Sequence, residues 1–158
     1  MKFEIIPGYD HKKEIGDLFQ EYTDMLVAAA PNFAGYLVLQ RFDEELDHLR
    51  EKYDSLYLAL TEEGEAVGCA ALHRVDDKRC EIKRLYVREP YRKTGLGTVL
   101  TEKILDDARE HGYEKMVLDT FPFLESAVRL YRRLGFVDSV QYNDNPIPDE
   151  MIFLEKPL

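Results

Sequence analysis

A short stretch in the middle of the chain, LYVREPYRKTGLG (residues 85–97), combines residue types that could bind an anion. An apolar run is followed by three cationic side chains and then by Gly95 and Gly97, where a helical pattern begins. The N-terminus of a helix leaves up to about four backbone N–H groups without intrahelical partners and carries the positive end of the helix dipole. Glycines let an anion approach those groups, and Arg92 and Lys93 could add charged hydrogen bonds. The junction therefore predicts a phosphate or pyrophosphate site.

The glycine spacing separates this junction from other phosphate-binding loops. A nucleoside-triphosphate loop needs Lys and then Ser or Thr after its last glycine, but Thr98 and Val99 follow here, and the dinucleotide fingerprint needs Gly or Ala where this chain has Leu100. What remains is the pattern R-x-x-G-x-G over residues 92–97, between an expected strand and an expected helix. This pattern resembles the acyl-CoA binding motif of the GNAT superfamily of acetyltransferases.

The resemblance extends beyond the glycines. Upstream, CEIKRLYVREPYR (residues 80–92) is similar to the fourth strand of the family, and downstream, SAVRLYRRLGF (residues 126–136) is similar to its second signature. The likeness covers nearly the whole chain, strongly over residues 66–136 and weakly before residue 55. It implies acetyl-CoA as co-substrate, with the pantetheine arm paired along the strand end and the phosphates at the helix start. The residues so implied are Leu85, Tyr86, Val87, Arg92, Lys93, Thr94, Gly95, Leu96, Gly97 and Thr98.

One position departs from the family pattern. Many relatives carry an asparagine that contacts the pantetheine arm three residues before the alanine of the second signature, and this chain has Leu124 there. Glu125 and Ser126 are the candidates to replace that contact.

Acetyl transfer from a thioester to an amine needs a neutral nucleophile, hydrogen-bond donors for an oxyanion, and a group that assists the departing thiolate. By the resemblance, Tyr131 is the tyrosine whose hydroxyl lies near the sulfur, and Glu81 stands where histone acetyltransferases of this superfamily carry a glutamate base. Strand alternation places Glu81 on one face with Lys83 and Leu85, and a backbone N–H near Leu85 is expected to contact the thioester oxygen. Alternatively, Tyr131 is a core aromatic, Glu81 pairs with a neighbouring cation, and water removes the proton.

Three further polar residues are candidates for binding the acceptor. Asp119 and Thr120 end an expected strand beside the expected cleft, although Asp119 could equally cap the helix that follows. Tyr142 lies in an acidic segment, residues 141–150, which often borders the acceptor site in this family and which could also be a plain solvated turn.

Hydrophobic periodicity predicts the elements that must position these residues. Alternation and short apolar runs indicate strands, and apolar residues at spacings of three and four indicate helices. The expected strands are residues 2–7, 55–60, 65–75, 80–87, 115–120, 136–140 and 151–158. The expected helices are residues 15–29, 42–53, 96–112 and 121–134.

Short connections between the second, third and fourth strands favour an antiparallel meander. With the resemblance, the element order implies a GNAT-like α/β fold: a mixed, mostly antiparallel seven-stranded sheet, splayed between the fourth and fifth strands and flanked by about four helices. We find no internal repeat, low-complexity tract or linker, so a single domain over residues 1–158 is expected.

Composition limits the classes of partner. The 158 residues are 45% hydrophobic and 33% charged with a net charge of -10, which argues against general attraction to nucleic acid or membrane surfaces. The N-terminal apolar run is too short for a signal sequence and no run approaches the ~20 residues of a membrane helix, so a cytoplasmic location is expected. Cys69 and Cys80 lack metal-ligand spacing and are interpreted as reduced core thiols, and no metal is expected.

The sequence thus predicts transfer of an acetyl group from acetyl-CoA to a primary amine of a small molecule or peptide by direct attack. A non-catalytic acyl-CoA binding or sensing module, and an acyltransferase that uses longer acyl groups, remain as alternatives. The identity of the acceptor is left open. A homodimer through an edge strand is a family-level expectation.

Overall fold

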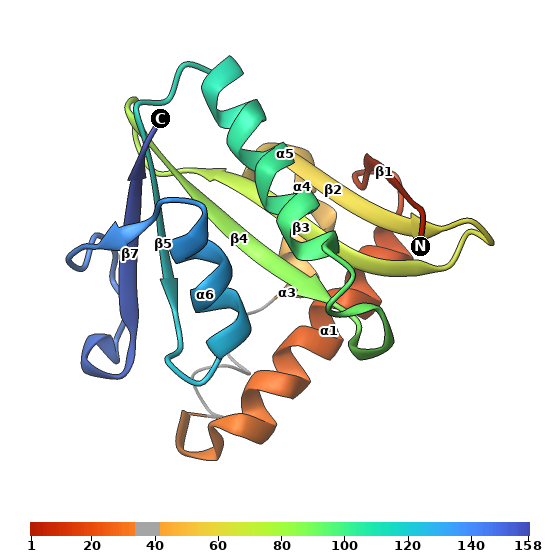
Figure 1. Cartoon of the computed structure of the whole chain (residues 1–158), viewed down its shortest axis with the longest axis horizontal. Coiled ribbons are helices and arrows are strands. Elements are labelled where there is room, and N and C mark those ends of the chain that lie inside the picture. Colours follow the sequence, from red (N-terminus) through yellow and green to blue (C-terminus); the bar gives the residue numbers. More distant parts are fainter. Residues whose placement is uncertain (34–41) are drawn as a thin grey trace.

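A single seven-stranded sheet organises the chain, and the computed structural model describes residues 1–33 and 42–158 (Figure 1). The strands are β1 (Phe3–Pro7), β2 (Tyr53–Thr61), β3 (Ala66–Arg74), β4 (Arg79–Val87), β5 (Lys115–Thr120), β6 (Val137–Asp138) and β7 (Ile152–Pro157). Their order is β1-β2-β3-β4-β5-β7-β6, and every neighbouring pair is antiparallel except β4–β5. The predicted mixed, mostly antiparallel sheet with a β2–β3–β4 meander is confirmed.

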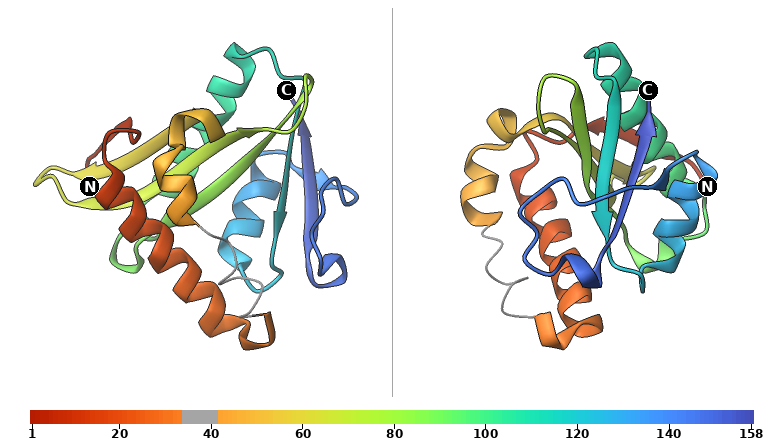
Figure 2. Two further views of the ribbon diagram at one scale, coloured as in Figure 1. Left: turned by 180° about the vertical axis from the view of Figure 1, so that it is seen from behind. Right: turned by 90° about the vertical axis from the view of Figure 1, so that its left-hand side faces the viewer.

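The helices cover both faces of the sheet. Those in the described ranges are α1 (Lys12–Ala29), α3 (Phe42–Asp47), α4 (Leu49–Lys52), α5 (Leu96–Glu110) and α6 (Glu125–Arg133). Helices α5 and α6 lie on one face, and α1, α3 and α4 lie on the other (Figures 1 and 2). None of the helices in this part of the chain is long and apolar enough to cross a membrane.

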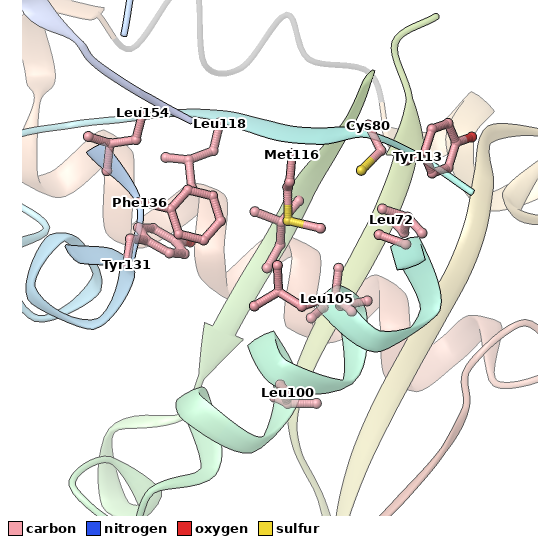
Figure 3. Close-up of a cluster of buried hydrophobic side chains, with 14 of the residues drawn as sticks. Leu72, Cys80, Leu100, Leu105, Tyr113, Met116, Leu118, Tyr131, Phe136 and Leu154 are labelled. Carbon is pink, nitrogen blue, oxygen red and sulfur yellow. The ribbon is translucent and has the colours of Figure 1, made fainter. Parts of the chain in front are cut away.

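Each face has its own hydrophobic core. Side chains from α5, β5 and the end of α6 form the larger one, in which Tyr131 lies beside Phe136 (Figure 3). Residues of α1, β2 and β3 form the second, around Phe19 and Leu56. The two cysteines lie one in each core, free and fully buried, which confirms their predicted place as core residues.

The sheet opens between its two parallel strands. Strand β4 pairs with β5 only over residues 79–81, opposite residues 115–117. Beyond Glu81 the strands diverge, as Figure 1 shows, so residues 82–87 of β4 have no strand partner on that side within the described chain. The predicted splay is confirmed, and it leaves an unpaired strand edge, which is the kind of backbone that an extended ligand can join.

A β-bulge interrupts β4 at the opening. Arg84 has a φ of 61°, and the register against β3 shifts between Cys69 and Ala71. The Cys69 thiol donates a hydrogen bond to the carbonyl oxygen of Arg84 at 3.1 Å. A bulge inserts one extra residue and therefore reverses the alternation of the side chains that follow. The expectation that Leu85 shares a face with Glu81 is wrong, because Leu85 packs against the α5-side core while Glu81 points to the opposite side.

All four expected helices differ at one or both ends, and two of them differ most. The segment 42–53 is split at His48 into α3 and α4, and Tyr53 is already extended, with its side chain in the core beside Phe19. Helix α6 begins at Glu125 rather than at Phe121: Pro122 disfavours a helical backbone at Phe121, and a turn at residues 122–123 precedes the helix. The two boundaries were mispredicted for the same reason: the helical spacing of apolar residues extends over residues whose backbone is not helical.

Candidate active site

A cavity of about 310 Å³ lies where β4 and β5 diverge. Its walls come from five parts of the chain: the bulge region of β4 (82–85), the end of β5 (119–121), α1, α6 and the loop 143–146 before β7. Of the predicted site residues, the structure brings Leu85, Asp119, Thr120 and Tyr131 together here.

Tyr131 presents an unpartnered hydroxyl to this cavity. Its side chain is 7% exposed and its ring packs edge-on against Phe136, with centroids 5.5 Å apart. The hydroxyl makes no hydrogen bond to any described residue, although the side chain lines the cavity. Burial, followed by the nearby Tyr22 and Asp119, raises the pKa of Tyr131 well above its usual value. The group therefore keeps its proton near neutral pH and can donate a hydrogen bond to a ligand.

Asp119 forms the polar wall opposite α1. Its Oδ2 accepts hydrogen bonds from Nδ2 of Asn143 at 2.8 Å and Nδ2 of Asn145 at 3.1 Å. It does not cap α6, because the residue before that helix is Leu124 and no side chain caps it. The alternative capping role considered for Asp119 is wrong, and the carboxylate instead holds the loop 143–146 against the cavity.

Tyr22 is a cavity residue that the sequence did not indicate. It faces the cavity from α1 and packs edge-on against Tyr86, with ring centroids 5.9 Å apart. Burial is the main cause that raises its pKa to about 12, and Asp119 contributes. In the sequence Tyr22 is simply one apolar position of an amphipathic helix, so only its place against the opened sheet distinguishes it.

Glu81 lies outside the cavity lining, with both carboxylate oxygens engaged. Oε1 is 3.1 Å from Nδ1 of His73, and Oε2 accepts a hydrogen bond from the hydroxyl of Tyr142. Burial opposes ionisation of Glu81, but the hydrogen bond from His73, the charge of Lys83 and the hydrogen bond from Tyr142 outweigh it and lower the pKa. This geometry favours a structural role for Glu81 over proton transfer. Tyr142 is likewise directed to Glu81 and not into the cavity.

Arg84, at the bulge, was not among the expected site residues. Its side chain is 8% exposed, lines the cavity, and stacks over the ring of Phe19 at 4.6 Å. Nη2 donates to Oε2 of the buried Glu45 at 2.7 Å, whereas Nε has no hydrogen-bond partner in residues 1–33 and 42–158. No sequence signal distinguishes this arginine from its neighbours, because the bulge that turns it inward is a tertiary feature.

The predicted anion-binding junction has the expected backbone. Gly95 precedes α5 with a φ of 86°, and the N–H of Leu96 lies 3.4 Å from Oγ1 of Thr94. The N–H groups of the next two residues, Gly97 and Thr98, make no hydrogen bond within the described part of the chain. A Cβ at Gly97 would meet only Leu130, at an ordinary 3.5 Å, so packing does not require glycine there. The space beside these donors is open to a ligand.

The cations around the junction are arranged differently from the expectation. Nε of Arg92 donates to the carbonyl of Val87 at 2.7 Å, and its guanidinium lies 5.6 Å from the ring centroid of Tyr86. Within the described residues, Arg92 thus makes no hydrogen bond to the start of α5, while Lys93 is exposed with a φ of 63°. Arg133 of α6, which the sequence analysis did not select, reaches Oγ1 of Thr98 at 3.3 Å.

Arg88, the third cation of the stretch, is committed elsewhere. Nη2 and Nε contact the Glu21 carboxylate at 2.6 to 3.1 Å, and Nη1 donates to the carbonyl of Ala66 at 2.7 Å. It ties α1 to the sheet and leaves little capacity for a phosphate. In residues 1–33 and 42–158, no group of three or more histidine, cysteine, aspartate or glutamate side chains is placed to hold a metal ion.

Comparisons with known proteins match this architecture. An uncharacterized N-acetyltransferase of Schizosaccharomyces pombe is 39% identical over 137 residues, which cover 84% of this chain and 80% of that protein. The crystal structure of a GNAT family acetyltransferase from Staphylococcus aureus has a TM-score of 0.77 at 22% identity over 99% of both chains. A GNAT family acetyltransferase from Elizabethkingia anophelis, solved with acetyl-CoA bound, has a TM-score of 0.61 at 26% identity over 73% of this chain and 82% of that one.

The family model described as "Acetyltransferase (GNAT) family" matches residues 16–136. That span begins in α1 and ends just after α6, and it includes the splayed strands, the glycine junction and Tyr131. The opened sheet, the free helix N-terminus and these matches have one explanation: the chain belongs to the GNAT family of acetyltransferases.

Proposed function

We propose that the protein transfers an acetyl group from acetyl-CoA to a primary amine. One observation carries the proposal: an unpaired strand edge leads into a helix start with free N–H groups, and both adjoin a cavity that contains an unpartnered tyrosine hydroxyl. The edge suits an extended amide-bearing arm, the helix start suits a pyrophosphate, and the hydroxyl suits a leaving thiolate. Few ligands other than an acyl thioester of coenzyme A need all three.

The residues present fit that co-substrate. The first turn of α5 offers the N–H groups of Gly97 and Thr98, and Arg133 stands beside them. The Elizabethkingia relative binds acetyl-CoA on a similar fold, which supports the same ligand here. At the end of β4, the carbonyl of Val87 already accepts a hydrogen bond from Arg92. The pantetheine pairing is therefore expected mainly over residues 82–86.

Few protein groups are needed for the proposed acetyl transfer. The amine attacks the thioester carbonyl, a C–N bond forms, the C–S bond breaks, and the sulfur gains a proton or a hydrogen bond from Tyr131. Asp119 lies where a carboxylate would attract the amine as an ammonium ion. We assign removal of the amine proton to water in the cavity, because Glu81 has a lowered pKa and both oxygens engaged. The bulge places the backbone near Leu85 at the cavity, where an N–H could face the thioester oxygen.

A sensing module that binds acyl-CoA without turnover is the second candidate. It would share the junction and the strand edge but would not need an unpartnered hydroxyl in the cavity. Tyr131 therefore favours the enzyme.

The test is thermal unfolding with acetyl-CoA, coenzyme A and ATP each in excess, followed by thiol release from acetyl-CoA against a panel of primary amines. We expect both coenzymes to raise the melting temperature, ATP to leave it unchanged, and at least one amine to release thiol. Stabilisation without thiol release for any amine would identify a sensor. No shift with either coenzyme would overturn the proposal at the helix junction.

A further inference from the structure

We propose that Tyr22 of α1 binds the acceptor: its hydroxyl oxygen accepts a hydrogen bond from the attacking amine and orients the lone pair of the nitrogen toward the thioester. This inference rests on the proposed acetyl transfer and assigns a further residue to the same site. The cavity is lined by two tyrosines, Tyr131 from α6 and Tyr22 from α1, and neither hydroxyl makes a hydrogen bond to a described residue.

The hydroxyl of Tyr22 is open to a ligand. Within residues 1–33 and 42–158, Nε of Arg84 is the one side-chain polar atom that is fully buried and lacks a hydrogen-bond partner. The Tyr22 hydroxyl also lacks a partner among these residues, so it is not closed off, and its side chain lines the cavity. Polar groups at such a wall are satisfied by water or by a ligand. Tyr22 therefore has the free hydrogen-bonding capacity that a substrate contact requires.

Packing holds the ring of Tyr22 in place. It lies edge-on to the ring of Tyr86, with centroids 5.9 Å apart and 60° between the two planes. The guanidinium of Arg92 lies 5.6 Å from the Tyr86 centroid and restricts that ring in turn. Leu26, one helical turn after Tyr22, lines the same cavity, so this face of α1 is directed at the opening. A side chain that is already held by packing loses little conformational entropy when it binds a ligand.

The two tyrosines approach the opening from opposite faces of the sheet. Tyr131 lies on the face that also carries the start of α5, where the phosphates are proposed to bind, and Tyr22 lies on the other face (Figure 2). A coenzyme that runs from this helix start along the edge of β4 would bring its sulfur to Tyr131. The amine must reach the thioester carbonyl from the side that the coenzyme leaves open, with its lone pair aligned for attack. Tyr22 stands on that open side.

A neutral phenol suits this role. Burial is the main cause that raises the pKa of Tyr22 to about 12, so the hydroxyl keeps its proton near neutral pH and its oxygen remains an acceptor. As the C–N bond forms, positive charge develops on the nitrogen until a proton passes to water, and the C–S bond breaks with a hydrogen bond from Tyr131 to sulfur. A hydrogen bond from the nitrogen to Tyr22 strengthens as this charge develops, which favours the transition state over the bound amine.

The first measurement is thiol release by Tyr22→Phe on the full chain, with acetyl-CoA saturating and the best primary amine of the panel varied. Phenylalanine keeps the ring and removes only the hydroxyl. We expect kcat/KM for the amine to fall by at least about tenfold, the usual effect of losing a hydrogen bond to a charged group. The melting temperature and the dissociation constant for coenzyme A should not change, because the hydroxyl has no bond within the described fold.

A bisubstrate analogue tests the same contact without turnover. The probe is coenzyme A whose sulfur carries an N-propylacetamide group through the acetamide methylene, so that an amide N–H stands close to the position of the attacking nitrogen. Calorimetry with this probe and with coenzyme A separates contacts beyond the sulfur from contacts to the coenzyme. Tyr22→Phe should weaken the probe by about fivefold, as for one neutral hydrogen bond, and leave coenzyme A unchanged.

Tyr9→Phe is the matched control. It removes a hydroxyl that donates to the carbonyl of Tyr53 at 2.8 Å, and Tyr9 does not line the cavity. This variant should keep the wild-type kcat/KM for the amine and the wild-type affinities for the probe and for coenzyme A.

The outcomes separate this proposal from the proposed function. If Tyr22→Phe keeps the wild-type kcat/KM and probe affinity, or weakens coenzyme A as much as the probe, Tyr22 does not bind the acceptor and the acetyltransferase stands. If no amine releases thiol, the proposed enzyme is wrong. The probe then still decides the role of Tyr22, because a loss of affinity confined to the probe supports the contact and unchanged affinity overturns it.

Discussion

The sequence predicts catalytic roles for both Tyr131 and Glu81, but the structure places the two side chains in different environments. The tyrosine hydroxyl faces the cavity and makes no hydrogen bond to a described residue, and its raised pKa keeps the proton in place. The glutamate is held by His73 and Tyr142, and its lowered pKa makes it a weak base. A catalytic group needs free hydrogen-bonding capacity toward the substrate, which only the tyrosine has.

Tyr131→Phe should lower kcat by about 100-fold, a typical contribution of a positioned acid. The melting temperature should stay within error or rise slightly, because the hydroxyl makes no hydrogen bond in the described structure. Steady-state kinetics and a melting curve measure both. Tyr113→Phe, which removes a hydroxyl that bonds Asp54 far from the cavity, should leave kcat unchanged. An unchanged kcat in Tyr131→Phe would show that the residue is only a core aromatic.

Glu81→Gln should lower the melting temperature at pH 7 and leave the rising acidic limb of the pH–rate profile in place. A folded-state pKa below the unfolded value of ~4.3 means that ionised Glu81 stabilises the fold above that pH. This contribution is lost as pH falls through the lower folded pKa, so the stability gap between wild type and variant should close in acid. Melting curves from pH 3 to 7 test this.

The exposed Glu62 provides the matched control for that series, since Glu62→Gln removes a carboxylate that makes no hydrogen bond or ion pair in the described structure. Its melting temperature at pH 7 should match that of the wild type. If Glu81→Gln instead kept its stability at pH 7 but lost activity and the rising acidic limb of the pH–rate profile, Glu81 would be the base.

The strand-to-helix element that ends at α5 uses its two glycines for different purposes. Gly95 has a φ of 86°, a backbone conformation that disfavours any side chain, so the turn itself requires glycine. Gly97 is helical, and an added Cβ would fit against Leu130. The absence of a side chain at Gly97 therefore serves the approach of a ligand and not the fold.

Gly97→Ala should accordingly separate stability from binding. Alanine favours a helix over glycine by up to about 1 kcal/mol, so the melting temperature should rise or hold. The dissociation constant for coenzyme A should weaken by roughly tenfold, since each 1.4 kcal/mol of lost contact corresponds to that factor. Calorimetry and melting curves measure the two effects.

The opposite pattern is expected at the other end of the helix. Gly112 has a φ of 84°, so Gly112→Ala should lower the melting temperature through backbone strain without changing the affinity for coenzyme A. A Gly97→Ala variant that bound coenzyme A as tightly as wild type would remove the junction from the site.

The bulge in β4 is a second element with a specific support. The carbonyl of Arg84 accepts from the buried Cys69 thiol, whose pKa is raised to about 12 by burial, so the thiol keeps its proton and remains a donor. Cys69→Ala removes this donor and should destabilise the protein by about 1–3 kcal/mol. Cys69→Ser keeps a donor and should lose less. Equal losses in chemical denaturation would show that the thiol only fills space.

At the scale of the whole molecule, the opening of the sheet connects two cores. The cavity is lined from α1 and from α6, which lie on opposite faces, and from the strands between them. A ligand bound there contacts both halves of the fold. Arg88 adds to this coupling by joining α1 to the end of β4 through Glu21.

Acetyl-CoA should therefore stabilise the chain as one unit. At 100 times its dissociation constant, a ligand adds about 2.7 kcal/mol, which is roughly 5–10 °C for a domain of this size. We expect a single calorimetric transition that moves as a whole, in agreement with one domain over residues 1–158. Two transitions, of which only one moved, would contradict that prediction.

The strand-to-helix junction, the β2–β3–β4 meander and the place of Tyr131 in α6 were predictable from sequence because each depends on residues close together in the chain. Glycine spacing, periodicity and turn length act locally, and β5 was predicted to its ends at residues 115 and 120. The bulge at Arg84, the pairing of Asp119 with Asn143 and Asn145, and the engagement of Glu81 by Tyr142 were not predictable. Each depends on side chains that are distant in sequence, and only the packing of α1 and the loop before β7 against the opened sheet brings them together.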